Sequence, residues 1–348
     1  MGDISRLTQL AARLAGDRIG ALEHLPTKWT PVRRQKMRRS IMLERRSQSV
    51  RSQSALTHAL HVAAGVATMG LLMAAALPGD DADSAGASGA AAGGSTVATR
   101  PKETAFGAYL GAPYHYPSDF TLKKDGRHDL TIKDIDWYTK PFDNPLYYGA
   151  RVQRWQEGGR FGTMIDFVHS KVYAPLDASY PFEGTLDGKP APATGRLADY
   201  FSKLEWTHGH NMLTFNGLMR FAGLGPIAPY VGIGAGVSLP HSEIHLETDP
   251  ARTYEYQYTG PTAQALFGLE YRLKTGSVFI EYKFTIADYL GPLTHTDGSW
   301  LPLDLWRQFT RWRSGEEPPG GWAGARLTSH QVVSGFTVRF APGRVTAE

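Results

Sequence analysis

The sequence contains no cysteine and lacks the runs of about 20 apolar residues that span a bilayer as helices. The first absence excludes a disulfide framework, a zinc–thiolate site, an iron–sulfur cluster and a thiol nucleophile. The second excludes a polytopic helical membrane protein. With 42% hydrophobic and 11% aromatic residues, the chain is also too apolar for a disordered protein. The sequence therefore predicts a folded unit with a large apolar surface to bury.

Positive charge is concentrated near the start of the chain. The first 58 residues hold 12 Lys and Arg against 4 Asp and Glu, so the remainder is slightly acidic although the whole chain carries +4. A DNA-binding arm is one interpretation of these arginines, but no helix-turn-helix or aromatic stacking platform lies beside them. We therefore predict no nucleic-acid partner.

The basic segment runs into an uncharged stretch rich in alanine and glycine, residues 59–76, which ends in small residues before a Leu-Pro pair. A basic region, an apolar region and a small-residue cleavage site together predict a secretory signal sequence within residues 1–78. Met37 or Met42 is an alternative start for so long a leader. A membrane anchor is the competing interpretation, since the stretch is close to the minimum length for a spanning helix.

The rest of the chain divides by composition. Residues 79–104 are mostly Ala, Gly, Ser and Asp, which predicts a disordered linker. Residues 105–341 show an apolar period of two, as in the alternation of Val332, Phe336 and Phe340 with polar neighbours, and this period is that of β-strands. Residues 342–348 form a short C-terminal tail.

The strands favour a membrane barrel over a soluble periplasmic sandwich. Alternation alone fits both, but strands of about ten residues, an export signal and a final strand ending in Phe340 fit an outer-membrane barrel. We count eight strands, which close the smallest common barrel. They are expected at 105–123, 128–154, 159–174, 208–221, 227–246, 253–273, 276–289 and 328–340. Short turns then alternate with long loops, notably the Pro-rich stretches 180–194 and 301–322.

The polar face of these strands would point into the lumen. It carries five charged residues of both signs, which predicts a mutually neutralising ion network: Glu270, Arg272, Glu281, Lys283 and Arg339. Three glycines of one strand, Gly232, Gly234 and Gly236, also share this face. They indicate either a hollow in the lumen or close packing of strands.

Histidines and acids gather at the external strand ends. His208 with His210, and His241 with Glu243, are spaced two apart, which places alternate side chains on one face of a strand. Such pairs can bind a metal, so His208, His210 and His241 form a candidate site for a divalent ion of unknown identity. Histidines at a membrane interface are also common without any metal.

Residues 106–340 resemble a family of outer-membrane barrels known as lipid A oxidases. The resemblance lies in YYGARV (147–152), FGTMIDFVHSKVYA (161–174), HGHNMLTFN (208–216), PYVGIGAGVSLPHSE (229–243), GPTAQALFGLEYRL (260–273), FIEYKFT (279–285) and GFTVRF (335–340). It implies an outer-membrane enzyme that oxidises the proximal glucosamine of lipid A to 2-aminogluconate with molecular oxygen as co-substrate.

If this activity is present, the sugar headgroup lies at the external rim. His169, Lys171, His210 and Glu243 are then the candidate catalytic residues, with Glu243 or a histidine as the base for the anomeric hydroxyl. Lys171 or Arg252 would pair with a lipid phosphate. The expected partners are lipid A or lipopolysaccharide, the outer membrane, and the barrel-assembly machinery that receives the strand ending at Phe340.

Two other functions remain open. A non-catalytic small barrel would have a structural or lipopolysaccharide-binding role. A deacylase or palmitoyl transferase is less favoured, because the His-x-Ser arrangement of the deacylase barrels does not occur between residues 105 and 340.

Overall fold

The computed structural model describes residues 101–222, 225–249 and 251–340. The predicted leader and signal (1–78), all but the last residues of the predicted linker (79–104) and the tail (342–348) lie outside these residues. No helix within the described ranges is long and apolar enough to cross a membrane.

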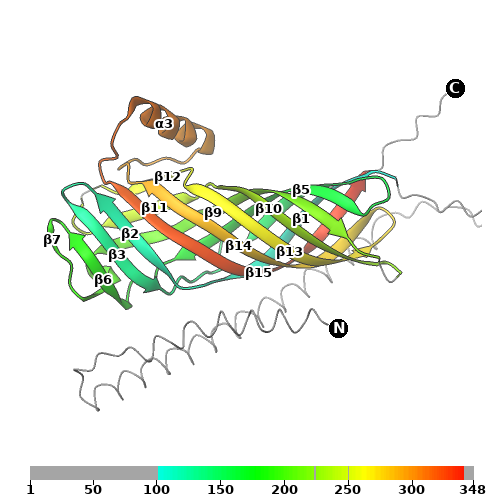
Figure 1. Cartoon of the computed structure of the whole chain (residues 1–348), viewed down its shortest axis with the longest axis horizontal. Coiled ribbons are helices and arrows are strands. Elements are labelled where there is room, and N and C mark those ends of the chain that lie inside the picture. The colour runs from blue at the N-terminus through cyan, green and yellow to red at the C-terminus, as the bar shows by residue number, and fades with distance from the viewer. Residues whose placement is uncertain (1–100, 223–224, 250, 341–348) are drawn as a thin grey trace, which may run out of the picture. The chain divides into compact units, whose positions relative to one another are not determined.

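Eight antiparallel strands of the described residues pair side by side and close into a ring (Figure 1). The ring closes because the first and last strands pair from Thr104 opposite Phe340 to His115 opposite Ser329. The predicted eight-stranded antiparallel barrel is confirmed. In ring order the strands are β1 (Glu103–His115), β4 (Tyr148–Trp155), β5 (Phe161–Tyr173), β9 (Phe201–Arg220), β10 (Ile227–Ser238), β13 (Gly260–Arg272), β14 (Gly276–Pro292) and β15 (Trp322–Phe340).

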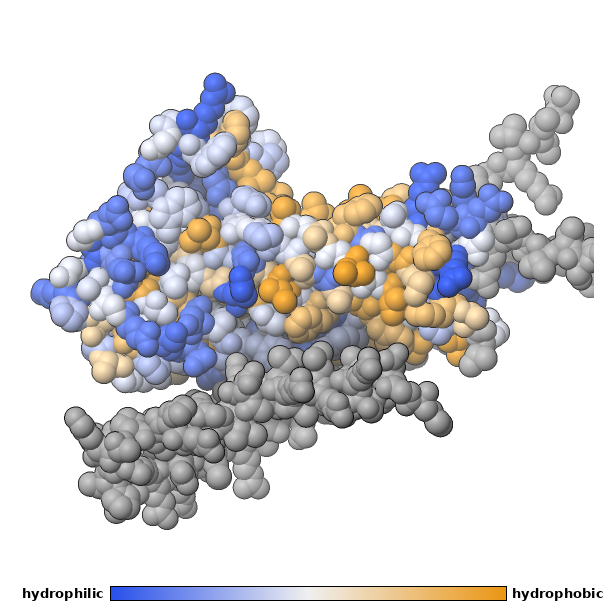
Figure 2. Space-filling model, viewed as in Figure 1, coloured by the Kyte–Doolittle hydropathy of each residue, from blue (hydrophilic) through white to orange (hydrophobic). Residues whose placement is uncertain are grey.

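The outer face of the ring is apolar and the inner face is polar. Along β13, Thr262 and Gln264 are buried whereas Phe267 and Leu269 are exposed, and Ile233 on β10 is 76% exposed. Figure 2 shows apolar residues gathered over the part of the barrel that the ring strands build alone. A closed ring leaves no unpaired strand edge, and an apolar outer face is stable only in lipid. These strands therefore span a membrane.

The two ends of the barrel differ. At one end the strands join through short turns, residues 156–160 and 273–275. At the other end β2 (Ser118–Lys124), β3 (His128–Ile135), β6 (Ser179–Leu186), β7 (Lys189–Pro190) and β8 (Thr194–Arg196) extend the sheet from β15, and β11 (His241–Leu246) with β12 (Thr253–Tyr256) extends it from β9. Short turns are periplasmic in such barrels, so the extended end is external.

The two Pro-rich stretches are not plain loops. Residues 180–194 lie largely in β6, β7 and β8, and residues 301–322 begin with helix α3 (Leu301–Ser314). Strands of two or three residues are too short to show a period, and Pro302 sits in the first turn of the helix, where proline is tolerated. The expected strands at 105–123 and 128–154 are also divided, since each contributes one segment to the ring and one to the external sheet.

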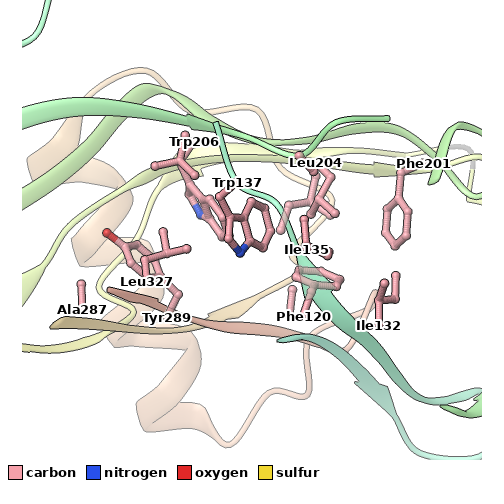
Figure 3. Packing of buried hydrophobic residues seen from close by; sticks show 14 of the residues in the cluster. Phe120, Ile132, Ile135, Trp137, Phe201, Leu204, Trp206, Ala287, Tyr289 and Leu327 are labelled. Carbon is pink, nitrogen blue, oxygen red and sulfur yellow. The ribbon is translucent and has the colours of Figure 1, made fainter. Parts of the chain in front are cut away.

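The external end has its own apolar core. Phe120, Leu130, Ile132, Phe201 and Leu204 are all buried inside it and contact one another through a larger cluster. Figure 3 shows the same cluster continuing to Trp137, Trp206 and Tyr289. This core rests on the barrel and holds the external strands that carry the candidate site.

Candidate functional site

The lumen at membrane level is filled by a charged cluster. Arg151 donates from Nη2 to Glu281 Oε1 over 2.8 Å, and Lys283 forms an ion pair with Asp166. Tyr230 donates its hydroxyl to Glu281 over 2.7 Å. All four charged side chains are fully buried. The arrangement neutralises two cations with two anions and leaves the lumen packed with side chains.

A second charged cluster lies nearer the periplasmic end. Glu270 accepts from Arg220 Nη2 over 2.8 Å and lies 3.8 Å from Arg339 Nη1. Arg272 pairs with Glu103 over 2.6 Å. The five charges singled out in the sequence thus divide between two clusters, with Glu281 and Lys283 in the first and Glu270, Arg272 and Arg339 in the second.

The glycines of β10 do not leave a hollow. A Cβ placed on Gly236 would meet the backbone of Leu213 and Thr214, and one placed on Gly234 would meet Phe215 and Asn216. The neighbouring strand therefore already occupies this space. Close packing, not a cavity, accounts for the glycines.

An outward-facing polar cluster lies on the external wall, on β9 and β11. Ile244 on β11 and Leu204 on β9 belong to the inner core, so the alternating residues point away from it. Glu243 lies opposite Glu205 in this register. It is 3.9 Å from His208 Nδ1, 3.5 Å from Arg252 Nη1 and 4.0 Å from Lys203 Nζ. We call Lys203, Glu205, His208, His241, Glu243 and Arg252 the wall cluster.

Aromatic rings and a loop enclose one side of the wall cluster. His241 lies against the rings of Tyr254 and Tyr256, with centroids 4.3 and 4.6 Å away, and its centroid is 5.3 Å from that of His208. His241 Nε2 bonds the carbonyl of Gly298 over 3.1 Å. Its Nδ1 is buried without a hydrogen-bond partner in the described chain. This nitrogen therefore meets neither solvent nor a polar partner among the described residues.

Burial sets the charge state of the wall cluster. Removal from water raises the pKa of the Glu243 carboxyl above its usual range, and neighbouring Lys203 opposes this rise only in part. Burial also lowers the pKa of the His241 imidazole. At neutral pH the cluster thus offers a neutral His241 and, two residues further along the same face of β11, a carboxyl group whose proton affinity is higher than normal. Such a pair suits proton transfer.

The structure separates His208 from His210, although they are two residues apart. On β9 the residues from Trp206 to His210 oppose only Ser170 to Val172 on β5, which forms a bulge, and Gly209 has φ +143°. His210 consequently turns inward, where it hydrogen-bonds Tyr289 and lies 5.5 Å from the ring of His115. His208 stays in the wall cluster.

The predicted three-histidine metal site is not formed. Within the described ranges no group of three or more His, Asp or Glu side chains is placed to hold a metal ion. Only His208 and His241 of the expected set lie together, so these residues do not fit a three-ligand centre.

The other two candidates lie beside the wall cluster. His169 faces outward, stacks on Tyr148 and bonds Asn211 Oδ1 through Nδ1 over 2.8 Å. Lys171 is buried and donates to the carbonyl of Asp143 over 2.9 Å. Its ammonium group is therefore tied to the segment between β3 and β4 and is not presented on the surface.

Sequence reasoning missed several residues of both regions. Lys203 and Glu205 were not singled out, because they lie between the expected strands 159–174 and 208–221, in a stretch expected to be a long loop. Arg151 and Asp166 were also missed. Their positions on the buried face of β4 and β5 follow the same alternation as Glu281 and could have been found from it.

No protein-family model matches the sequence, and a search of curated proteins finds no match. Solved outer-membrane proteins match the structure at low similarity. OprG from Pseudomonas aeruginosa is 12% identical with a TM-score of 0.33, covering 69% of this chain and 95% of its own. AlkL in lipid bilayers is 12% identical with a TM-score of 0.34, covering 76% and 100%. The protease OmpT from Escherichia coli is 10% identical with a TM-score of 0.32, covering 71% and 99%.

The closed ring of the described strands and its apolar outer face are observed in this structure and do not depend on the similarity to other proteins. An even number of antiparallel strands with short turns at one end and an extended opposite end is the architecture of outer-membrane barrels. The chain is therefore a β-barrel of the outer-membrane type.

Proposed function

We propose that this barrel oxidises the proximal glucosamine of lipid A to 2-aminogluconate, with molecular oxygen as co-substrate. The observation that carries the proposal is the place of the wall cluster. It faces outward from the barrel, immediately beyond the apolar belt and at the external end. A lipid headgroup of the outer leaflet lies at this level, whereas a lumen packed with ion pairs leaves no room for one.

The reaction needs a proton acceptor at the sugar. Oxidation of a free anomeric carbon removes its hydrogen and the hydroxyl proton, and two electrons pass to oxygen, which becomes hydrogen peroxide. Water then opens the resulting lactone to the acid, for a net gain of one oxygen atom. We assign the hydroxyl proton to the carboxylate of Glu243, with His241, two residues earlier on β11, as a second proton carrier. Because the wall cluster does not fit a three-ligand metal, no step is assigned to one.

The cations of the wall cluster would hold the anionic lipid. The side chain of Arg252 is 42% exposed and that of Lys203 is 45% exposed, so both can turn toward a phosphate. Arg252 is also 3.1 Å from Asp297, which holds the guanidinium beside Glu243. Charge-assisted bonds of this kind would place the sugar with its anomeric carbon near the base. Lys171, bound to a carbonyl, is a less suitable phosphate ligand.

Mass spectrometry of lipid A from cells expressing the chain tests the proposal. We expect a gain of one oxygen on the proximal sugar in aerated cells, none without oxygen, and none with Glu243→Gln. The matched control is Glu247→Gln, the same change at an exposed position just beyond β11, which should retain the product. Unchanged lipid A under aeration from a folded barrel would exclude the oxidase function.

A non-catalytic barrel is the second candidate. The observation that favours it is the fully buried network of Arg151, Asp166, Glu281 and Lys283, which serves stability and needs no substrate. This function predicts lipid A of unaltered mass together with retention of lipopolysaccharide on the purified barrel.

A further inference from the structure

Helix α3 packs against the barrel through its polar side. Asp304 is 1% exposed and its Oδ2 accepts from the backbone N–H of Tyr256. Gln308 bonds both the N–H and the C=O of Tyr258, over 2.7 and 2.8 Å. Arg311 donates to Thr296 over 2.9 Å. Residues 304, 308 and 311 lie on one face of a helix, so the contact with the barrel is a polar stripe.

The opposite side of α3 is aromatic and exposed. Trp306, Phe309 and Trp312 are 62%, 45% and 76% exposed, and their rings follow one another at 5.8 and 6.1 Å. A helix on a protein surrounded by water turns its apolar side to the protein and its polar side outward. This helix does the reverse. Its pattern matches that of the barrel wall in the membrane, where the large apolar side chains also face outward.

The position of α3 is close to the edge of the apolar belt. Its contact at Tyr258 lies two residues before β13 begins, and the outer face of β13 belongs to the belt. Leu290 donates its backbone N–H to the carbonyl of Thr259. Its side chain is 55% exposed and extends the apolar surface toward the external end. Figure 1 shows α3 beside the wall next to β12.

We propose that α3 is an interfacial helix that buries its aromatic face in the outer leaflet and binds phosphorylated lipids. Arg311 belongs to the stripe that faces the barrel, whereas Arg313 is exposed and Arg307, 3.6 Å from Asp304, has a side chain that is 42% exposed. The outward charge of the helix comes from Arg307 and Arg313 and is positive, complementary to an anionic headgroup layer. Tryptophan and arginine together are typical of helices that lie in this layer.

The same helix is joined to the wall cluster. Asp297 and Gly298, just before α3, hold Arg252 and His241. Docking of α3 in lipid would therefore fix the wall cluster at headgroup height. This consequence rests on the proposed function, whereas the lipid contact of α3 does not.

Fluorescence of the full chain in nanodiscs, one barrel per disc, tests the lipid contact. The emission lost in the double variant Trp306→Phe, Trp312→Phe isolates these two indoles. With phosphatidylcholine and phosphatidylglycerol carrying brominated acyl chains, we expect most of that difference emission to be quenched, while acrylamide in water quenches it weakly. The emission lost in the variant Trp137→Phe is the control. Trp137 lies in the external core, so neither quencher should reduce this emission.

Each other outcome contradicts the proposal. Strong quenching by acrylamide without quenching by bromine would place α3 in water. Shielding from both quenchers would mean that protein covers the helix. The double variant Arg307→Gln, Arg313→Gln should reduce bromine quenching in discs that contain phosphatidylglycerol, but not in discs of phosphatidylcholine alone. If the unsubstituted chain and the variant were quenched equally in both kinds of disc, the arginines would have no role in binding the lipid phosphates. Because no reading depends on lipid A oxidation, failure here is distinct from failure of the proposed function.

Discussion

The membrane-spanning half and the external end of this barrel are built on opposite patterns. In the spanning half Lys283 and Asp166 lie inside while Phe215 and Ile233 face outward. At the external end Phe120 and Phe201 fill the interior, and the charged wall cluster faces outward. The polar and apolar faces of the sheet therefore exchange sides where the strands leave the lipid. The inversion shows that the surrounding medium, not the strand pairing, decides which side chains are buried.

The largest effect is expected from breaking the inner ion network. Lys283→Met leaves Asp166 buried beside fewer cations, and removal of one partner of a buried pair costs about 3 to 5 kcal/mol. Urea unfolding in detergent micelles measures the loss. Lys274→Met, in an exposed turn, is the matched change and should cost less than about 0.5 kcal/mol. Equal stability of the two variants would mean that the network does not hold the barrel.

A cavity in the external core is expected to act locally. Leu204→Ala removes a fully buried side chain and should cost about 2 to 5 kcal/mol of local stability. Hydrogen exchange should quicken in β2, β3 and β6 while the amides of β13 and β14 stay protected. Uniform acceleration around the whole ring would show that the two halves unfold as one unit.

The wall cluster is expected to influence activity more than stability. A base must be unprotonated, and burial raises the pKa of Glu243, so conversion of lipid A should rise with pH through a midpoint above 4.5, the usual value for glutamate. The pH profile of the purified barrel measures this midpoint. Glu243→Gln should lower the rate by about 10² or more while changing the unfolding free energy little. A pH profile with a midpoint below 4.5 would mean that a group other than Glu243 is the base.

The smallest effect is expected from the exposed pair Arg326 and Asp288 on β15 and β14. Its nitrogen and oxygen lie 2.6 Å apart with both side chains in solvent, and such pairs contribute about 0 to 1 kcal/mol. Arg326→Gln should leave the urea midpoint nearly unchanged and insensitive to salt. A loss similar to that of Lys283→Met would contradict the distinction between the buried and exposed pairs.

The sequence predicted the ring because lipid and lumen impose a strict period of two on β13, β14 and β15. It could not show where a strand leaves the ring, since the same alternation continues into β2 and β11. Helix α3 was missed because the prolines of residues 301–322 favour a loop, although Pro302 lies in the first turn of the helix. Its apolar residues also do not face the barrel, so they do not mark a packed stripe.

The candidate site was predicted in part. Glu243, His241, His208 and Arg252 do meet at the external wall. The separation of His210 depends on the bulge at Gly209, which shifts the alternation of β9. Spacing in a sequence assumes an unbroken strand, so it could not reveal this change of side.

The long strand β15 has a consequence for the order of assembly. Residues 322–338 pair with β14, whereas on the other edge residues 329–340 pair with β1 and residues 322–325 with β2. Most of these partners are remote in the sequence, and contacts between remote segments form slowly because the intervening chain must first be brought together. This last strand of the described residues thus completes both the ring and the external sheet, so a barrel stalled before β15 docks would expose two open edges at once.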